Sequence, residues 1–188
     1  MKKRPNRPID PTVLGTVTFD RDLDATALDT PERILEYFRR KRFITNGCTS
    51  IEATIKDNPE LELVYEDLGE ADAYIMKLAD GRFRIAINTR HHKNRQRFSM
   101  AHEYAHYQLH REHIGTRPEG ERILFRNAER NSIEYQANRV ASEILMPEAE
   151  FVDFIKRSNG DVRAIATIFD VSPEAVRVRA SQLGWAMN

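Results

Sequence analysis

Hydrophobic and polar positions follow two different periods along this chain. Residues 61–88 alternate between apolar and polar side chains, a period of two that is typical of strands buried on one face. An Asp80-Gly81 pair within this stretch favours a tight turn between two strands. Elsewhere apolar residues recur at three- and four-residue steps, which predicts amphipathic helices over 30–43, 98–109, 137–145 and 161–180. The pattern predicts an α+β fold whose small, largely antiparallel sheet precedes the later helices.

Local signals set the ends of the first helix. Pro31 suits the first helical position after Thr30. The run Arg39-Arg40-Lys41-Arg42 places positive charge near the C-terminal end, where it interacts favourably with the helix dipole. Asn46-Gly47 should break this helix, and a second short helix is expected over 50–56.

The helical stretch over 98–109 carries a His-Glu-x-x-His motif. His102 and His106 are four residues apart and point the same way on a helix, so both imidazoles can bind one metal ion. Glu103 follows the first histidine, where its carboxylate can take a proton from a metal-bound water. Two solvated histidines and a surface glutamate are the alternative. Apolar residues at helical spacing around the motif favour a buried helix and therefore the metal site.

A catalytic zinc ion usually takes three protein ligands and leaves one position for water. We expect the third ligand from a helix over 131–147, in which Glu134 and Asn138 lie four residues apart on one face. Glu134 can bind the metal while Asn138 orients a ligand histidine by a hydrogen bond. Glu134 could instead be only the carboxylate of a capping box that begins at Asn131. Beside a His-Glu-x-x-His helix, the ligand interpretation is the stronger.

His110 is an alternative third ligand, because it lies four residues beyond His106 and shares its face of the helix. Three histidines at successive steps of four on one straight helix spread along its axis, at about 6 Å per step. A set of His102, His106 and Glu134 closes around one ion more easily, because Glu134 comes from another helix.

Two segments together resemble the ImmA/IrrE family of zinc metallopeptidases. Residues 97–106 read RFSMAHEYAH against a family pattern close to R-F-T-L-A-H-E-L-G-H, and residues 134–147 read EYQANRVASEILMP against E-x-x-A-N-x-F-A-A-E-L-L-M-P. The resemblance implies a zincin-like fold of the gluzincin kind, with zinc held by His102, His106 and Glu134 and with Glu103 as the catalytic base. None of the departures from the pattern removes a catalytic group.

The same resemblance implies a substrate class. Many members of that family cleave helix-turn-helix repressors and so relieve transcriptional repression, which makes a protein of this kind the expected partner. Mn²⁺ or Fe²⁺ could occupy the same ligands in place of Zn²⁺. In metallopeptidases of this general kind an edge strand can bind the substrate backbone by strand addition. Phe83–Asn88 is our candidate for that strand, although it could be purely structural.

Two amphipathic helices around a short turn follow the second metal helix, with spacing that resembles a helix-turn-helix. Ser172 suits the cap of the second of these helices and Pro173 its first position. Arg177 and Arg179 would project from it as candidate contacts to nucleic acid. Residues 156–188 carry only a small excess of positive charge, which is thin for a DNA-binding module. We therefore favour a structural or protein-recognition role over direct DNA binding.

Composition excludes several classes of protein. The chain has 29 basic and 29 acidic residues, so its net charge gives no general attraction to nucleic acid. A single cysteine, Cys48, excludes an intramolecular disulfide, and the sequence has neither a secretion signal nor an apolar run of membrane-spanning length. We expect a cytoplasmic protein without membrane contact. The acid-free run 90–97 could attract an acidic partner or a phosphate backbone, although such runs are more often solvated connections.

These signals divide the chain into an N-terminal extended arm (1–29), a metallopeptidase domain (30–155) and a helix-turn-helix-like segment (156–188). The charged stretch 112–130 between the metal helices is expected to fold beside the cleft and gate substrate entry. The expected function is a zinc-dependent endopeptidase that cleaves a helix-turn-helix repressor. The alternative is a DNA-binding or protein-binding regulator whose metal site is structural or inactive.

Overall fold

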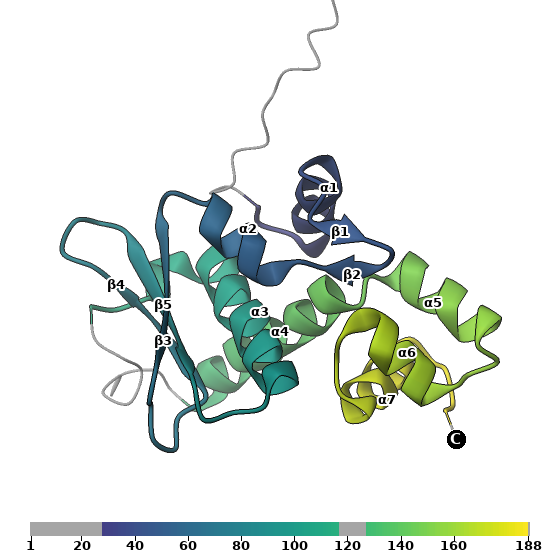
Figure 1. Cartoon of the computed structure of the whole chain (residues 1–188). Coiled ribbons are helices and arrows are strands. Elements are labelled where there is room, and N and C mark those ends of the chain that lie inside the picture. The colour runs from purple at the N-terminus through teal and green to yellow at the C-terminus, as the bar shows by residue number, and fades with distance from the viewer. Residues whose placement is uncertain (1–27, 117–126, 188) are drawn as a thin grey trace, which may run out of the picture.

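The computed structural model describes residues 28–116 and 127–187. Residues 1–27 of the predicted arm and 117–126 of the predicted gating stretch lie outside these ranges. Figure 1 shows a small sheet on one side of two long central helices, α3 and α4, and the C-terminal helices on the other side. This arrangement confirms the α+β class. Within the described ranges, no helix combines the length and the apolar character needed to cross a bilayer.

The N-terminal elements agree with the sequence signals except at Asn46-Gly47. Helix α1 (Pro31–Arg40) begins as predicted, with the Thr30 hydroxyl accepting a hydrogen bond from the Arg33 backbone N–H at 3.3 Å. Asn46 and Gly47, however, form the turn of a hairpin between β1 (Ile44–Thr45) and β2 (Cys48–Thr49). Their φ angles of 51° and 84° match the twist of paired strands. Helix α2 (Ile51–Asp57) follows, as predicted.

The main sheet is mixed, with strand order β3-β5-β4. β3 (Leu61–Glu66) is parallel to β5 (Phe83–Asn88), and β4 (Ala73–Lys77) is antiparallel to it. The expectation of a largely antiparallel sheet is therefore wrong, because alternation along a strand does not encode its direction. The assignment of Phe83–Asn88 to an edge is also wrong, since β5 lies in the centre and β3 and β4 form the edges.

Asn88, the last residue of β5, forms hydrogen bonds to the loop that connects β3 to β4. Its side-chain amide donates hydrogen bonds to the carbonyls of Gly69 and Ala71, at 3.0 and 2.6 Å. Its backbone N–H donates to the Asp72 carbonyl at 3.0 Å. The residue is fully buried. A buried amide with these partners holds the loop 67–72 in one position.

Helix α3 (Lys93–Leu109) packs against β4 and β5 and also against α4 (Asn127–Leu145). Tyr104 and Tyr107 point from α3 into the core, where Tyr104 lies 5.7 Å from Phe38 between ring centroids. The Tyr107 hydroxyl donates to Glu60 at 2.8 Å, and the Arg111 guanidinium lies over the Tyr107 ring. Arg111 belongs to a short 3₁₀ turn (Arg111–His113) that follows α3. The helix is thus held along its length by the core.

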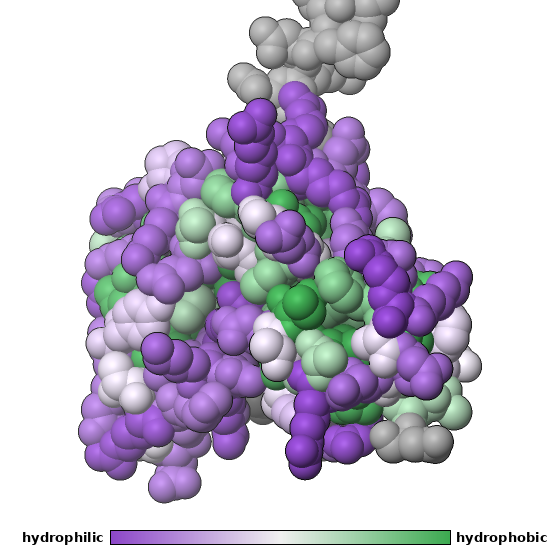
Figure 2. All heavy atoms as spheres, turned by 45° about the vertical axis from the view of Figure 1, so that its right-hand side comes forward, coloured by the Kyte–Doolittle hydropathy of each residue, from purple (hydrophilic) through white to green (hydrophobic). Residues whose placement is uncertain are grey.

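Three further helices complete the chain: α5 (Glu148–Arg157), α6 (Val162–Phe169) and α7 (Pro173–Gln182). The Ser172 hydroxyl caps α7 by accepting from the Ala175 N–H at 3.1 Å, as predicted. Asp170 makes the left-handed turn between α6 and α7. These two helices pack against each other, and they contact β2 and α4 as well. Figure 2 looks toward this side of the molecule and shows apolar side chains gathered in the middle of the face, with hydrophilic ones around them.

Candidate metal centre

His102 and His106 of α3 face Glu134 of α4. The two Nε2 atoms are 3.0 Å apart. The Glu134 carboxylate lies 3.3 Å from Nε2 of His102 and 3.6 Å from Nε2 of His106. Within the described chain, these three residues form the group that could hold a metal ion, with ligand atoms no more than 4.8 Å from one another.

These separations fit a metal ion. Ligand atoms at the corners of a zinc tetrahedron, with the usual bond lengths, are about 3.4 Å apart. Two imidazoles and one carboxylate also form the donor set of many catalytic zinc sites. His106 is almost fully buried and Glu134 is about one-third exposed, so the site is open on the Glu134 side. The donor set and its spacing therefore suit Zn²⁺.

Helix α4 begins at Asn127, four residues before the predicted cap. Glu134 consequently lies well inside the helix, and the capping-box interpretation of this residue is wrong. The two histidines hold the pKa of the Glu134 carboxyl far below its usual range, first through their hydrogen bonds and then through their charge. Burial by itself would lower the pKa of His102, but the hydrogen bond to Glu134 and the charges of Glu103 and Glu134 raise it overall.

The second ring nitrogen of each histidine also has a partner. Nδ1 of His102 lies 3.1 Å from Oδ1 of Asn138, the contact expected for Asn138. Nδ1 of His106 lies 3.1 Å from Nδ1 of His110, and Nε2 of His110 lies 3.2 Å from Oε1 of Gln136. His110 thus faces the back of His106 rather than the ligand cluster. The sequence pattern indicates His110 only as a possible ligand and does not predict this contact. The four-residue spacing between His106 and His110 could have indicated it.

Glu103 lies next to the cluster in a buried position, with an exposed fraction of 5%. Its charge contributes to the raised pKa of His102, so the carboxylate is within electrostatic reach of that ligand. Its role as the base stays a prediction.

Arg97 anchors the metal helix to two distant segments. Its guanidinium donates to the backbone carbonyls of Thr49, Phe169 and Asp170, at 3.1, 3.3 and 3.0 Å. It also forms an ion pair with the Asp170 carboxylate at 3.1 Å. The side chain is only 16% exposed. The N-terminal half of α3 is therefore connected to the β2 strand and to the turn between α6 and α7.

An apolar pocket of about 470 Å³ opens beside Phe98, one helical turn before His102. Leu145 and Met146 at the end of α4 and Val171 and Ala175 near the start of α7 contribute to its lining. The pocket thus lies where α3, α4 and the C-terminal helices meet.

The two arginines proposed as nucleic-acid contacts separate in the structure. Arg177 is half exposed and lies 3.8 Å from Glu174. Arg179 is buried and its Nε donates to the Met146 carbonyl at 3.1 Å. Burial lowers the pKa of Arg179. Its guanidinium packs against the end of α4, so the expectation that it projects toward DNA is wrong.

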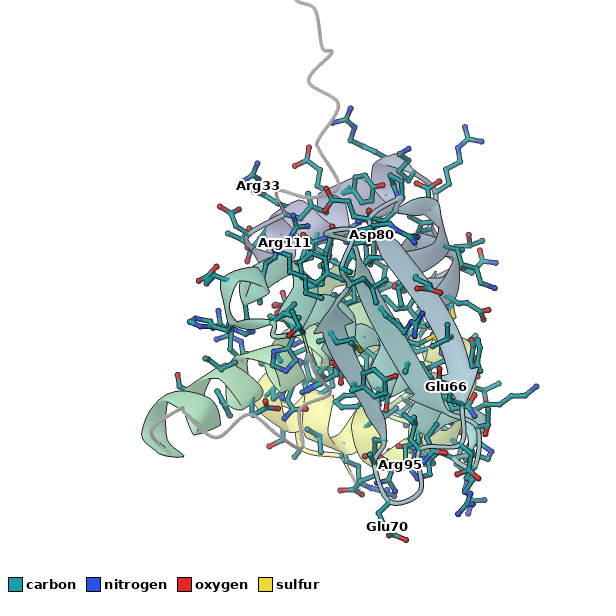
Figure 3. All side chains as sticks on the ribbon, turned by 90° about the vertical axis from the view of Figure 1, so that its left-hand side faces the viewer. Arg33, Glu66, Glu70, Asp80, Arg95 and Arg111 are labelled. Atoms are coloured by element: carbon teal, nitrogen blue, oxygen red, sulfur yellow. The ribbon has the colours of Figure 1, made fainter. Side chains whose placement is uncertain are left out.

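Acidic side chains of the loop 67–72 pair with arginines of the basic run 90–97, which crosses the start of α3. Arg90 pairs with Asp67 at 2.5 Å and Arg95 with Asp72 at 2.7 Å. Figure 3 views the sheet face-on and places Arg95 at the end of the sheet near Glu66, far from Arg111 at the opposite end. This pairing favours a solvated connection over an anion-binding surface.

Comparisons with known proteins concern the family and the fold of the chain. The family model of peptidase family M78, described as the IrrE N-terminal-like domain, matches residues 57–181. A solved structure named as a Mycobacterium tuberculosis transcriptional regulator is similar with a TM-score of 0.60 and 16% sequence identity, over 84% of this chain and 48% of that chain. The chain thus spans about half the length of that neighbour, and the likeness concerns the fold. No curated protein gives a significant match. Because the family model covers most of the chain, including both helices of the metal centre, this protein belongs to the M78 peptidase family.

Proposed function

We propose that this protein is a zinc-dependent endopeptidase. The observation that carries the proposal is the convergence of His102, His106 and Glu134, with buried Glu103 beside them, in a chain of the M78 family. Two imidazoles, a carboxylate and an adjacent acid are the components of metal-assisted peptide hydrolysis.

Each residue has a separate role in this chemistry. His102, His106 and Glu134 would hold the ion, and Asn138 orients the His102 ring. Bound zinc would supply Lewis acidity and lower the pKa of water toward neutrality. Glu103 accepts a proton from the attacking water and returns it to the departing amine nitrogen. Its burial shields the carboxylate from bulk water.

Strand β4 is the edge that fits an extended substrate. The pairs Asp72 with Asn88 and Leu78 with Arg82 are hydrogen-bonded, so the backbone groups of Ala73 and Ile75 point away from β5. β4 packs on α3, the helix that carries both histidines. A substrate strand added here would therefore run beside the metal helix.

A helix-turn-helix repressor is the substrate that we propose, from the resemblance of the two motif segments to the ImmA/IrrE family. The test incubates wild type and Glu103→Gln with Zn²⁺ or Mn²⁺ and with the helix-turn-helix repressor encoded beside the gene, followed by intact-mass analysis. Glu112→Gln is the matched control, because its side chain is 75% exposed. A single metal-dependent cut by wild type and control, absent with Glu103→Gln, supports the proposal. Full cleavage by Glu103→Gln would refute the role of the base.

The second candidate is a regulator that binds DNA or protein and has a structural metal site. The name of the similar structure, a transcriptional regulator, favours it. It predicts salt-sensitive duplex binding that Arg177→Ala weakens and Glu103→Gln leaves unchanged. The burial of Arg179 removes one of the two basic side chains on which that function would depend. Fluorescence anisotropy of labelled duplex DNA with wild type, Glu103→Gln and Arg177→Ala separates the two functions.

A further inference from the structure

We propose that His110 and Gln136 form a hydrogen-bond relay that sets the tautomer and orientation of the His106 ring for metal binding. This inference rests on the proposed metal centre. It assigns a positioning role to two residues that are not themselves among the ligands.

The relay follows from the two nitrogens of His106. Nε2 faces Nε2 of His102 and the Glu134 carboxylate, at 3.0 and 3.6 Å. When Nε2 uses its lone pair to bind a metal, a neutral imidazole carries its proton on Nδ1. That N–H points at Nδ1 of His110, 3.1 Å away. Nδ1 of His110 must therefore be the acceptor.

The contact between His110 and Gln136 fixes the tautomer of His110. If Nδ1 of His110 accepts, the neutral ring carries its own proton on Nε2. This nitrogen lies 3.2 Å from Oε1 of Gln136, and an amide oxygen can only accept. In the reversed direction Nδ1 of His106 would accept from His110, so the proton of neutral His106 would lie on Nε2 and block the metal, and Nε2 of His110 would face Oε1 of Gln136 as a second acceptor. The three residues consequently have one consistent proton arrangement, and it is the one that leaves Nε2 of His106 for the metal.

Burial makes the relay necessary at His106. His106 is 3% exposed and His110 is 6% exposed, so water is a poor substitute for the missing partner. His102 differs, because Asn138 supplies an acceptor oxygen directly. Helix α4 thus provides the third ligand, Glu134, and also the terminal acceptor of the relay, Gln136. The two histidine ligands are therefore oriented differently: Asn138 contacts His102 directly, whereas Gln136 acts on His106 through His110.

The test compares zinc affinity by chelator competition in wild type, His110→Leu and His110→Asn. Loss of a partner that orients a ligand typically weakens metal binding about 10- to 100-fold, which we expect for His110→Leu. In His110→Asn the side-chain oxygen can take the place of Nδ1, so we expect affinity near that of wild type. Gln136→Leu should weaken binding less than His110→Leu, and Gln136→Glu should restore it, because a carboxylate also accepts from Nε2.

A spectroscopic measurement separates positioning from general packing. In zinc-loaded, ¹⁵N-histidine-labelled wild type, the Nδ1 proton of His106 should be protected from exchange and shifted downfield, and both signatures should disappear in His110→Leu. Equal zinc affinity and an unchanged Nδ1 signal in His110→Leu and Gln136→Leu would overturn the relay while leaving the metal centre intact. Failure of wild type to bind zinc would overturn the metal centre and the relay with it. If His110→Leu does not fold, the Gln136 pair decides the outcome.

Discussion

Replacement of Arg97 by methionine tests how firmly the metal helix is connected to the rest of the protein. Methionine fills similar space and removes the charged donor to the carbonyls of Thr49, Phe169 and Asp170. Thr49 is fully buried, so no solvent replaces the guanidinium there. Loss of a charged hydrogen bond to such a group costs about 1.5–3 kcal/mol.

The other contacts of Arg97 add less. Asp170 is an exposed residue, so water can partly replace the guanidinium at its carbonyl, and the Phe169 carbonyl keeps a second donor in Sγ of Cys48 at 3.8 Å. The Asp170 side chain is 58% exposed, and such an ion pair contributes at most about 1 kcal/mol. We expect Arg97→Met to lower the free energy of unfolding by roughly 3 kcal/mol. For a chain of this length that corresponds to a melting temperature about 6–12 °C lower.

The assay is urea unfolding followed by circular dichroism, with Arg95→Met as the matched control. Arg95 lies two residues away on the same helix, but its side chain is 61% exposed and pairs with Asp72 at the surface. We expect its replacement to cost less than about 1 kcal/mol. Equal midpoints for the two variants would show that Arg97 does not hold α3 to the C-terminal helices.

Three further predictions concern stability. Asn88→Ala should cost about 1–2 kcal/mol in urea unfolding, because the carbonyls of the exposed residues Gly69 and Ala71 lose the buried amide that fixes their loop; a cost below about 0.5 kcal/mol would contradict this. Gly47→Ala should cost more than Gly81→Ala: both have a positive φ, but only at Gly47 would a Cβ meet an aromatic ring, at 3.1 Å. Equal losses in thermal melts would rule out that contact. Burial raises the pKa of Tyr104 and Tyr107, so their contribution to stability is complete below about pH 10, the unfolded value, and is lost as the pH rises above it. Absorbance at 295 nm should show these two ionising only as the protein unfolds, and ionisation in the folded state would contradict the burial.

The chemistry on the helices could be predicted from the sequence, because spacing along a helix determines which side chains share a face. His102 and His106 meet Glu134 as expected, and Asn138 contacts His102. The same rule, applied to apolar neighbours, would have located Arg179. It lies three residues after Val176 and next to Ala180, both buried, so it belongs to the interior face of α7.

Features that depend on pairing between distant segments could not be predicted. The central position of β5 arises from partners on both sides, which a strand's own pattern does not identify. The anchoring role of Arg97 requires knowledge that residues 49 and 169–170 lie beside it. The orientation of His110 depends on Gln136 of another helix. In each case the missing information was three-dimensional proximity.

The strand order has a consequence for how the chain is assembled during synthesis. β5 emerges last of the three strands of the main sheet and lies between the other two. Until Phe83–Asn88 has left the ribosome, β3 and β4 lack the neighbour that each pairs with and expose open edges. The β4–β5 pairing is local, whereas β3–β5 pairing joins residues about 20 positions apart and forms more slowly. The metal helix begins at Lys93, directly after β5, so completion of the sheet and formation of that helix occur within the same short interval of translation.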